Sequence, residues 1–366
     1  MMRSTHGAVR AGDAGHDLRR SPDRPKAHCS EDRGVLGARP LPRPSCSRRA
    51  FVAHICLAPL ALPAAAAAAK RPYRVGLLEA IPAEENKANL EAFRRGLRER
   101  GLVEGRNLVI VYRSADGRAE RFPDLAADLV RNHVDLIVAR GTPATRATLA
   151  ATGSIPVVMA TMGDPRPMVT SFARPGGNVT GLTTYSTELS GKRVELLKEF
   201  VPSLAHVTLL HDMANPAAHP EWDETRKAAA SLGLVATLVD VRSAEAIERA
   251  FEKLRPHEGL VVGADGLIQM HRKPIVDLAA RARVPAVYPG RDFVEAGGLM
   301  TYALDYANLY FRLASYVDRI AHGASPGELP IEQPTRFELV INAATAARLD
   351  LPIPTDLRLR ADALIG

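Results

Sequence analysis

The chain of 366 residues predicts an α/β protein in which two doubly wound lobes follow an N-terminal leader. After Lys70, short apolar runs rich in β-branched residues alternate with longer amphipathic stretches, which is typical of a parallel sheet covered by helices. Several short segments recur in the same order in the second half, which indicates a duplicated unit. The 297 residues left when the first 69 are set aside are enough for two domains.

The first half predicts strands that are buried on both faces. Their sequences are apolar almost throughout, as in parallel sheets, and Leu90, Phe93 and Leu97 form one apolar stripe on a helix. The predicted elements are, in order, a strand at Tyr73–Leu78, a helix at Asn86–Arg100, a strand at Asn107–Arg113, a helix at Ala119–Arg131, a strand at Val134–Ala139, a helix at Ala144–Ala151 and a strand at Ile155–Ala160.

The recurring segments predict where the chain passes between the lobes. Matching pairs are Gly101-Leu102 with Gly233-Leu234, Arg113-Ser-Ala115 with Arg242-Ser-Ala244, Ile155-Pro156 with Val284-Pro285, and Gly181-Leu-Thr-Thr-Tyr185 with Gly298-Leu-Met-Thr-Tyr302. The alternative is chance similarity between generic βα units. Each Gly-Leu-x-Thr-Tyr segment is expected to follow the last strand of its half and precedes a predicted helix, Leu189–Phe200 or Ala307–His322. A third passage is expected at Gly323–Gly327. The predicted lobes are therefore 70–182 with 303–325, and 183–302 with 326–366.

The leader, residues 1–69, carries most of the net charge of +7, because it holds 11 basic and 5 acidic residues. The whole chain has 48 basic and 41 acidic residues, so 37 basic and 36 acidic residues remain in the body. This nearly neutral body argues against a nucleic-acid partner. Arg48-Arg49, the apolar run Phe51–Leu62 and the alanines 64–69 have the three parts of an export signal. We predict export to the periplasm by the twin-arginine or the Sec route, without a lipid anchor.

The body lacks the residue patterns of common catalytic and metal sites. All three cysteines, Cys29, Cys46 and Cys56, lie in the leader, so the body cannot form disulfides or thiolate metal sites. It contains no P-loop, Gly-x-Ser-x-Gly or His-Glu-x-x-His motif. His211 and His219, with Glu221 nearby, are interpreted as surface residues rather than metal ligands. The sequence thus predicts no enzyme, no metal and no cofactor.

Polar residues at the carboxyl ends of strands are the candidate ligand-binding groups, because open α/β sheets bind ligands there. Glu79 follows the first strand, and Thr142 is placed to cap the helix that contains Ala144. Asp164 and Asp265 follow later strands, and each could cap a helix or bind a ligand ammonium group. Asp305 lies just past the second crossover. Tyr185, Tyr288 and Tyr302 could stack on a ligand or serve as wall and core residues.

At these residues the sequence resembles the ABC-transporter substrate-binding proteins of the tryptophan/phenylalanine-binding type. The matching stretches, within 71–365, are Leu90–Leu97, Gly105–Leu108, Gly141–Ala144, Gly163–Pro165, Ala173–Leu182, Glu188–Arg193, Phe293–Leu299 and Leu329–Asn342. Thr142, Asp164, Thr184 and Asp305 occupy motifs of the family. The second crossover reads Thr301-Tyr-Ala-Leu-Asp305 where the family usually has Ser-Tyr-Gly-Pro-Asp, and the loop Glu79–Asn86 differs from that of tryptophan binders.

The resemblance implies the type 1 periplasmic binding fold, with two Rossmann-like lobes joined by three crossovers. It implies a monomeric receptor that closes around a small polar organic ligand, such as an amino acid or an aromatic analogue. It also implies an ABC permease and ATPase as partners and contact with the membrane only through the permease. The alternatives are a ligand sensor that feeds a membrane signalling protein, an exported α/β enzyme and a DNA-binding regulator of the same fold.

Overall fold

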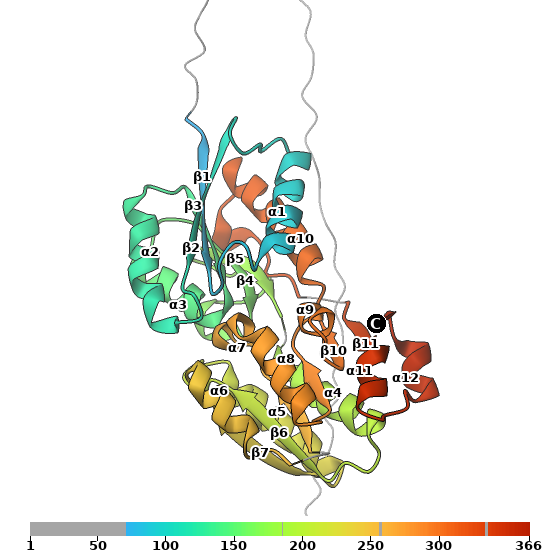
Figure 1. Cartoon of the computed structure of the whole chain (residues 1–366). Helices are drawn as coiled ribbons and strands as arrows, with labels where there is room; N and C mark the ends of the chain where they lie inside the picture. Colours follow the sequence, from blue (N-terminus) through green and yellow to red (C-terminus); the bar gives the residue numbers. More distant parts are fainter. Residues whose placement is uncertain (1–70, 185, 256–257, 334–335) are drawn as a thin grey trace, which may run out of the picture. The chain divides into compact units, whose positions relative to one another are not determined.

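The computed structural model describes residues 71–366 apart from 185, 256–257 and 334–335 (Figure 1). The predicted leader and Tyr185 lie outside the described residues. The described chain forms two β-sheets covered by helices, which confirms the predicted α/β class. No helix among the described residues is long and apolar enough to cross a bilayer.

The first lobe is built on a five-stranded parallel sheet with the order β2-β1-β3-β4-β5. Its elements are β1 (Tyr73–Glu79), α1 (Lys87–Glu99), β2 (Leu108–Ser114), α2 (Phe122–Arg131), β3 (Leu136–Arg140), α3 (Gly141–Ala151), β4 (Val157–Met162) and β5 (Val179–Thr183). Successive strand residues alternate between two cores. Leu136 and Val138 face α1, whereas Ile137 and Ala139 face α2 and α3. Burial on both faces explains why these strands are apolar throughout.

The second lobe repeats that strand order and extends it. Its seven strands run β12-β11-β10-β9-β8-β6-β7, so the five from β10 to β7 mirror the first sheet, as a duplication predicts. The elements are α4 (Ser186–Phe200), β6 (His206–His211), α5 (Ala218–Ser231), β7 (Val235–Asp240), α6 (Ala244–Phe251), β8 (Gly259–Val262), α7 (Gly266–Met270), α8 (Arg272–Arg281), β9 (Ala286–Tyr288), α9 (Arg291–Glu295), β10 (Met300–Ala303), β11 (Glu338–Asn342), α11 (Ala343–Arg348), α12 (Thr355–Arg360) and β12 (Ala363–Ile365). Among the described strands, β10 and β11 form the only antiparallel pair, and β12 runs parallel to β11.

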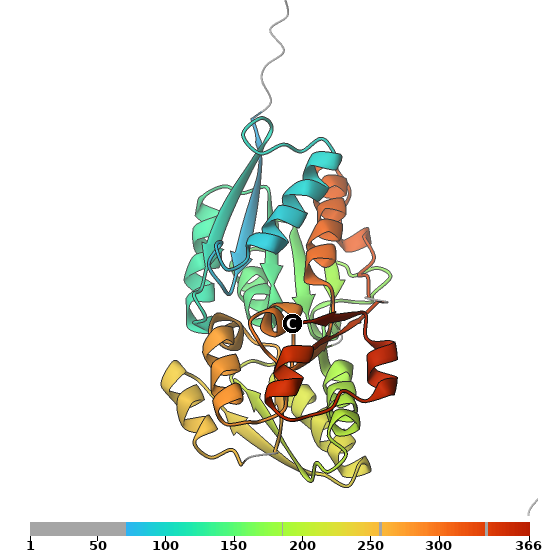
Figure 2. The same cartoon turned by 45° about the vertical axis from the view of Figure 1, so that its right-hand side comes forward.

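The chain passes between the two sheets more than once. It leaves the first sheet after β5 and returns after β10 to form α10 (Tyr306–Ala321), which lies along α1 in Figures 1 and 2, whereas α11 and α12 lie with the second lobe. Gly96 permits that close helix packing, because a Cβ there would sit 2.6 Å from the Phe311 carbonyl oxygen. The two Gly-Leu-x-Thr-Tyr segments overlap β5 and β10 themselves rather than following the last strands.

The third crossover lies later than the predicted boundary at 325. Gly176 donates a backbone hydrogen bond to Gly327, Thr180 Oγ1 donates to the Leu329 carbonyl at 2.8 Å, and Ile331 donates to Phe172. Residues 326–332 therefore pack against the first sheet, although the sequence placed them in the second lobe. The Gly-Ala-Ser-Pro-Gly composition of 323–327 marks a turn, and only the tertiary contacts show on which side of the crossover it lies.

Candidate functional site

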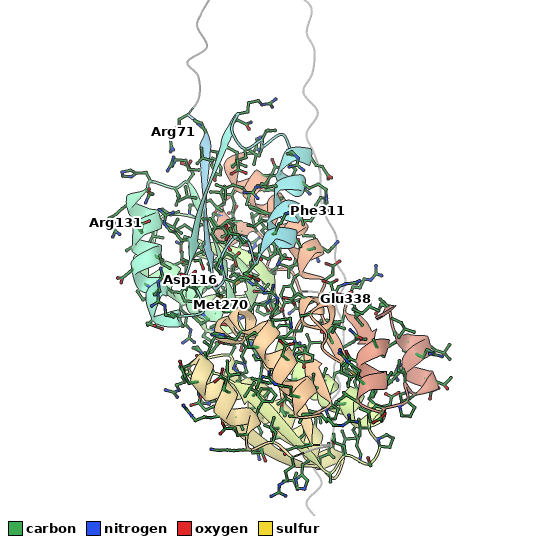
Figure 3. All side chains as sticks on the ribbon, viewed as in Figure 1. Arg71, Asp116, Arg131, Met270, Phe311 and Glu338 are labelled. Carbon is green, nitrogen blue, oxygen red and sulfur yellow. The ribbon has the colours of Figure 1, made fainter. Side chains whose placement is uncertain are left out.

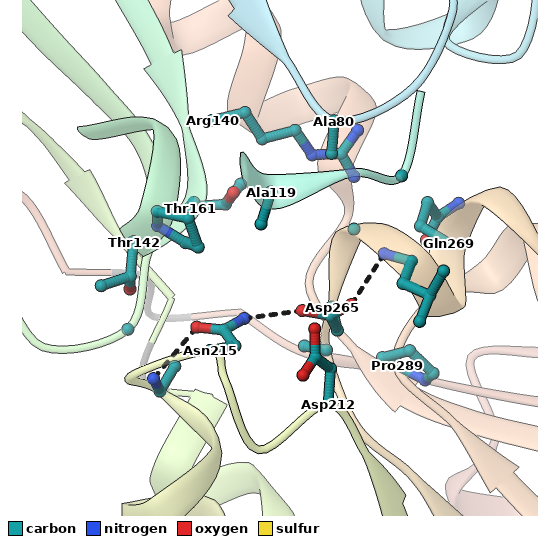
Figure 4. A pocket seen from close by; sticks show the side chains of 18 of the residues that line it. Ala80, Ala119, Arg140, Thr142, Thr161, Asp212, Asn215, Asp265, Gln269 and Pro289 are labelled. Carbon is teal, nitrogen blue, oxygen red and sulfur yellow. Dashed lines mark hydrogen bonds between the residues drawn. The ribbon is translucent and has the colours of Figure 1, made fainter. Parts of the chain in front are cut away.

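A pocket of about 840 Å³, including space open to solvent, lies at the carboxyl ends of strands from both sheets (Figure 4). Arg140, Thr142, Thr161 and Thr184 line it from the first lobe, and Asp212, Asn215, Asp265 and Gln269 line it from the second. The apolar or aromatic lining includes Phe122, Leu267, Pro289 and Tyr306.

Arg140 supplies positive charge to the wall formed by the first lobe. It is the last residue of β3, and its guanidinium carbon lies 5.4 Å from the Tyr306 ring centre and 6.0 Å from that of Tyr310. These are distances at which a cation is attracted to an aromatic face. Arg140 Nη1 donates a 3.3 Å hydrogen bond to Asn86 Oδ1. Arg140 is thus held by two rings of α10 and by the residue before α1 while it lines the pocket.

Glu79 lies behind Arg140 and is fully buried. Its Oε2 is 3.7 Å from Arg140 Nη1, and the Tyr310 hydroxyl donates to its Oε1. Burial raises the pKa of Glu79, which the Arg140 charge and the Tyr310 hydrogen bond oppose. Glu79 lines neither this pocket nor the adjoining one described below. Its link to the first pocket is therefore its contact with Arg140, which lines that pocket.

The N-terminus of α3 adds peptide N–H groups to the same wall. The helix begins at Gly141, so Thr142 lies inside the first turn and is not the cap that the sequence suggested. Gly141, Thr142 and Pro143 all line the pocket. The first N–H groups of a helix have no partner within it and suit a carboxylate. Nearby, Thr161 has φ of 59°, which a β-branched residue rarely adopts, so the pocket wall includes strained backbone.

The wall formed by the second lobe carries carboxylates instead. Asp212 follows β6, and Asp265 caps α7 by accepting a 2.7 Å hydrogen bond from the Leu267 N–H. Asn215 donates to Asp265 Oδ2 at 2.9 Å, as the dashed line in Figure 4 shows. Burial raises the pKa of Asp212, and the charges of Asp265 and Asp240 add to the rise. Two carboxylates on one wall favour a cationic group in the pocket.

A second pocket of about 910 Å³, also open to solvent, adjoins the first through Arg140, Gln269 and Tyr306, which line both. Asp305 lines this second pocket only, and its side chain caps α10 by accepting a 2.9 Å hydrogen bond from the Asn308 N–H. Two of its other carboxylates, Glu295 and Glu338, share Arg291. Most charges in this second pocket therefore already have partners in the protein.

The structure brings only part of the predicted set to the first pocket. Thr142, Thr184 and Asp265 line it, whereas Ala144 is buried in the core of the first lobe. Asp164 lines neither pocket, because its carboxylate pairs with Arg166 through two hydrogen bonds of 2.8 Å. Tyr302 also lines neither pocket and packs its ring 5.8 Å from that of Phe337. Tyr288 is a core residue that stacks on Phe293.

Sequence reasoning missed six polar residues of the first pocket, namely Arg140, Thr161, Asp212, Asn215, Gln269 and Tyr306. Arg140 and Asp212 lie at strand ends, so the rule that selected Glu79 and Asp265 could have found them. His211, interpreted from sequence as a surface residue, is fully buried. Within the described ranges no group of three or more His, Cys, Asp or Glu side chains could hold a metal ion.

Residues 74–365 match the family model described as ABC transporter substrate binding protein. A tyrosine-binding protein of Clostridioides difficile (strain R20291) is 23% identical over 285 residues, which cover 77% of this chain and 82% of that protein. A conserved domain protein from Vibrio cholerae has a structure with a TM-score of 0.74 and 25% identity, covering 80% of this chain and 100% of that one. The structure of an ABC domain from Streptococcus pneumonia in complex with L-Trp gives a TM-score of 0.70 at 24% identity, with coverage of 80% and 100%.

Proposed function

This chain belongs to the family of ABC transporter substrate-binding proteins, and on that premise we propose that it is an exported receptor for an α-amino acid or a close analogue. The ligand lies between the lobes, which close around it, and the receptor delivers it to a membrane permease and its ATPase. The chain works in the periplasm as a monomer, without a cofactor and without chemical change to the ligand.

The opposite charges of the two pocket walls are the observation that carries the proposal. Arg140 and the N-terminus of α3 present positive charge from the first lobe, whereas Asp212 and Asp265 present negative charge from the second. An α-amino acid has a carboxylate and an ammonium group on one carbon. It can therefore bridge the two walls with charge-assisted hydrogen bonds, and the bridge favours the closed arrangement of the lobes.

The remaining lining supports a ligand with an aromatic or apolar side chain. Phe122, Leu267, Pro289 and Tyr306 line the pocket beside the charged groups. The curated relative binds tyrosine and one structural neighbour holds L-Trp, which agrees with this lining. We therefore place L-tyrosine and L-tryptophan first among the probes, ahead of small aliphatic amino acids.

Calorimetric titration with matched ligand analogues tests the proposal. L-Tyrosine is compared with tyramine, which lacks the carboxylate, and with 3-(4-hydroxyphenyl)propanoate, which lacks the amine; L-tryptophan is compared with tryptamine and indole-3-propanoate. Each loss should weaken binding by tenfold or more, because a hydrogen bond to a charged group contributes about 1.5–3 kcal/mol. Equal affinity for an amino acid and its two analogues would contradict the zwitterion model.

Mass spectrometry of the small molecules that co-purify with the receptor complements the titration. An amino acid or analogue among them, together with a raised melting temperature in its presence, is the expected result, since a ligand stabilises the folded state by mass action. A co-purified sugar or polyol with no effect of any amino acid on melting would overturn the proposal.

A further inference from the structure

Behind the acidic wall lies a buried charged cluster of His211, Glu221 and Arg193. They come from β6, α5 and α4, and none is more than 1% exposed. Ionisable side chains are almost never fully buried unless they are paired, because their burial is otherwise unfavourable. The binding mode proposed above does not use them.

Glu221 is the acidic member of the cluster, and His211 and Arg193 are its basic members. His211 Nε2 lies 3.4 Å from Glu221 Oε2, and Ser190 Oγ donates to the same oxygen at 3.4 Å. Burial lowers the pKa of Arg193, and the nearby Glu221 carboxylate opposes that shift. Glu221 is therefore the electrostatic centre of the cluster.

One end of the cluster contacts both segments that carry the acidic wall. His211 Nδ1 is 3.2 Å from the carbonyl oxygen of Asp212, the next residue. The imidazole also fills the space beside Gly263, where a Cβ would lie 2.0 Å from the ring Cδ2 atom. Gly263 precedes Asp265 by two residues. A single ring thus contacts the backbone of Asp212 and the backbone two residues before Asp265.

The other end contacts the second crossover between the lobes. Arg193 Nε donates a 3.0 Å hydrogen bond to the carbonyl oxygen of Tyr302 in β10. The chain continues from there to Tyr306, which lines the pocket. The cluster is therefore in contact with the wall that faces the ligand and with the segment through which the chain returns to the first lobe.

We propose that the His211–Glu221–Arg193 cluster positions Asp212 and Asp265 for recognition of a ligand amine, an inference that rests on the amino-acid binding proposed above. These three are positioning residues that do not touch the ligand. Glu221 holds the imidazole, and the imidazole holds the two wall segments. Loss of the Glu221 charge should release Asp212 and Asp265 while the first-lobe wall stays in place.

Substitution Glu221→Gln tests the inference, because it keeps the side-chain shape and removes the charge. With L-tyrosine as the probe we expect the dissociation constant to rise about tenfold, whereas the constant for 3-(4-hydroxyphenyl)propanoate changes by less than about twofold. Glu224→Gln, on the same helix but at the surface, is the matched control and should change neither. A purely structural role for Glu221 would weaken both ligands equally, and that result would overturn the inference.

A measurement without ligand keeps the two proposals separable. Amide hydrogen exchange should become at least tenfold faster at Ala214, Ala217 and Gly263, whose N–H groups form the hydrogen bonds of the acidic wall and its support. The Thr184 amide, bonded to Met162 in the first lobe, is the internal reference. Gly263→Ala, which pushes against the ring, should give the same pattern. Unchanged exchange in both variants refutes the positioning role even if the wild type binds neither probe.

Discussion

The two walls of the pocket use the same scaffold and opposite charges. The strand order β2-β1-β3-β4-β5 of the first sheet recurs as β7-β6-β8-β9-β10 in the second, so both walls form at equivalent strand ends. Arg140 lies at the end of a strand in the first sheet, whereas Asp212 and Asp265 follow strands of the second sheet. The difference teaches that the repeated fold supplies the place of binding, whereas residues at the strand ends decide which charge each lobe presents.

Buried ionisable side chains lie behind each wall. Glu79 lies against Arg140 in the first lobe, and the cluster centred on Glu221 lies behind Asp212 in the second. Low polarity in the core strengthens these contacts and orients the side chains that face the ligand. The comparison predicts that the two walls respond differently when a charge is removed.

Arg140→Met should give the largest effect. It removes the positive wall and leaves Glu79 as an uncompensated buried carboxyl group, which destabilises a protein by about 3–5 kcal/mol. Denaturant unfolding measures the stability, and calorimetry should show that L-tyrosine binding is lost. The double variant Arg140→Met/Glu79→Gln removes the buried charge and should recover most of the stability but not the binding. Recovery of binding in the double variant would show that Arg140 does not contact the ligand.

Asp212→Asn tests the negative wall and should weaken L-tyrosine binding by about tenfold or more through loss of a charged partner. Burial raises the pKa of Asp212, so wild-type affinity should fall as the pH is lowered through that raised pKa, earlier than for an ordinary aspartate. Titration at several pH values should show this fall in the wild type and a weaker dependence in the variant.

Asp212 also predicts how stability without ligand depends on pH. A raised folded pKa means that its stabilising contribution is present below the unfolded pKa and is lost as the pH rises through the folded pKa. Asp212→Asn should therefore lose less stability than the wild type over that interval. A steeper loss of stability in the variant than in the wild type would show that the pKa of Asp212 is not raised in the folded protein.

Gly266→Val tests the approach of the two lobes. A Cβ at Gly266 would lie 2.7 Å from Ala80 Cβ, so a valine forces α7 away from the first lobe. A second close contact between the lobes lies at Gly117, where a Cβ would be 3.1 Å from Met270 Cβ. Figure 3 labels Met270 and Asp116, the residue before Gly117. We expect up to tenfold weaker binding in equilibrium titrations, within the range for overpacking. Gly153→Ala, in open space, is the control and should bind like the wild type.

Asp305→Ala should give the smallest effect on the first pocket. Its side chain caps α10, so its loss should lower the free energy of unfolding by about 1 kcal/mol. L-Tyrosine affinity should change by less than about threefold, because Asp305 lines only the adjoining pocket. A tenfold loss of affinity would restore Asp305 to the ligand site, as the sequence suggested.

Much of the fold could be predicted because burial leaves a regular pattern in the chain. Strands β1, β3 and β4 are apolar on both faces, and α1 carries one apolar stripe, so their types follow from local sequence. The predicted ends of the helices and strands were less accurate than their types. The helix expected to begin at Ala144 begins at Gly141, because a glycine, a threonine and a proline can occupy a first turn as well as a loop.

The candidate site was harder to predict because it depends on which acidic side chain pairs with which basic side chain. Sequence position places both Glu79 and Arg140 near strand ends, but only the pairing of β1 with β3 brings them together and buries the carboxyl group. The sequence suggested that Asp164 could bind a ligand, but its carboxylate pairs with Arg166 and it lines neither pocket. These outcomes rest on contacts across the fold that hydrophobic periodicity does not encode.

The sequence by itself determined the α/β class, the repeated unit, the family and the edge of the sheets where the pocket forms. Each follows from local pattern, because strand and helix periods and short motifs are written along the chain. The tertiary structure decided the lobe of residues 326–332, the burial of His211 and the choice of Arg140, Asp212 and Tyr306 as pocket residues. The physical reason is that burial and charge pairing depend on neighbours far apart in the sequence, and those neighbours exist only once the sheets have assembled.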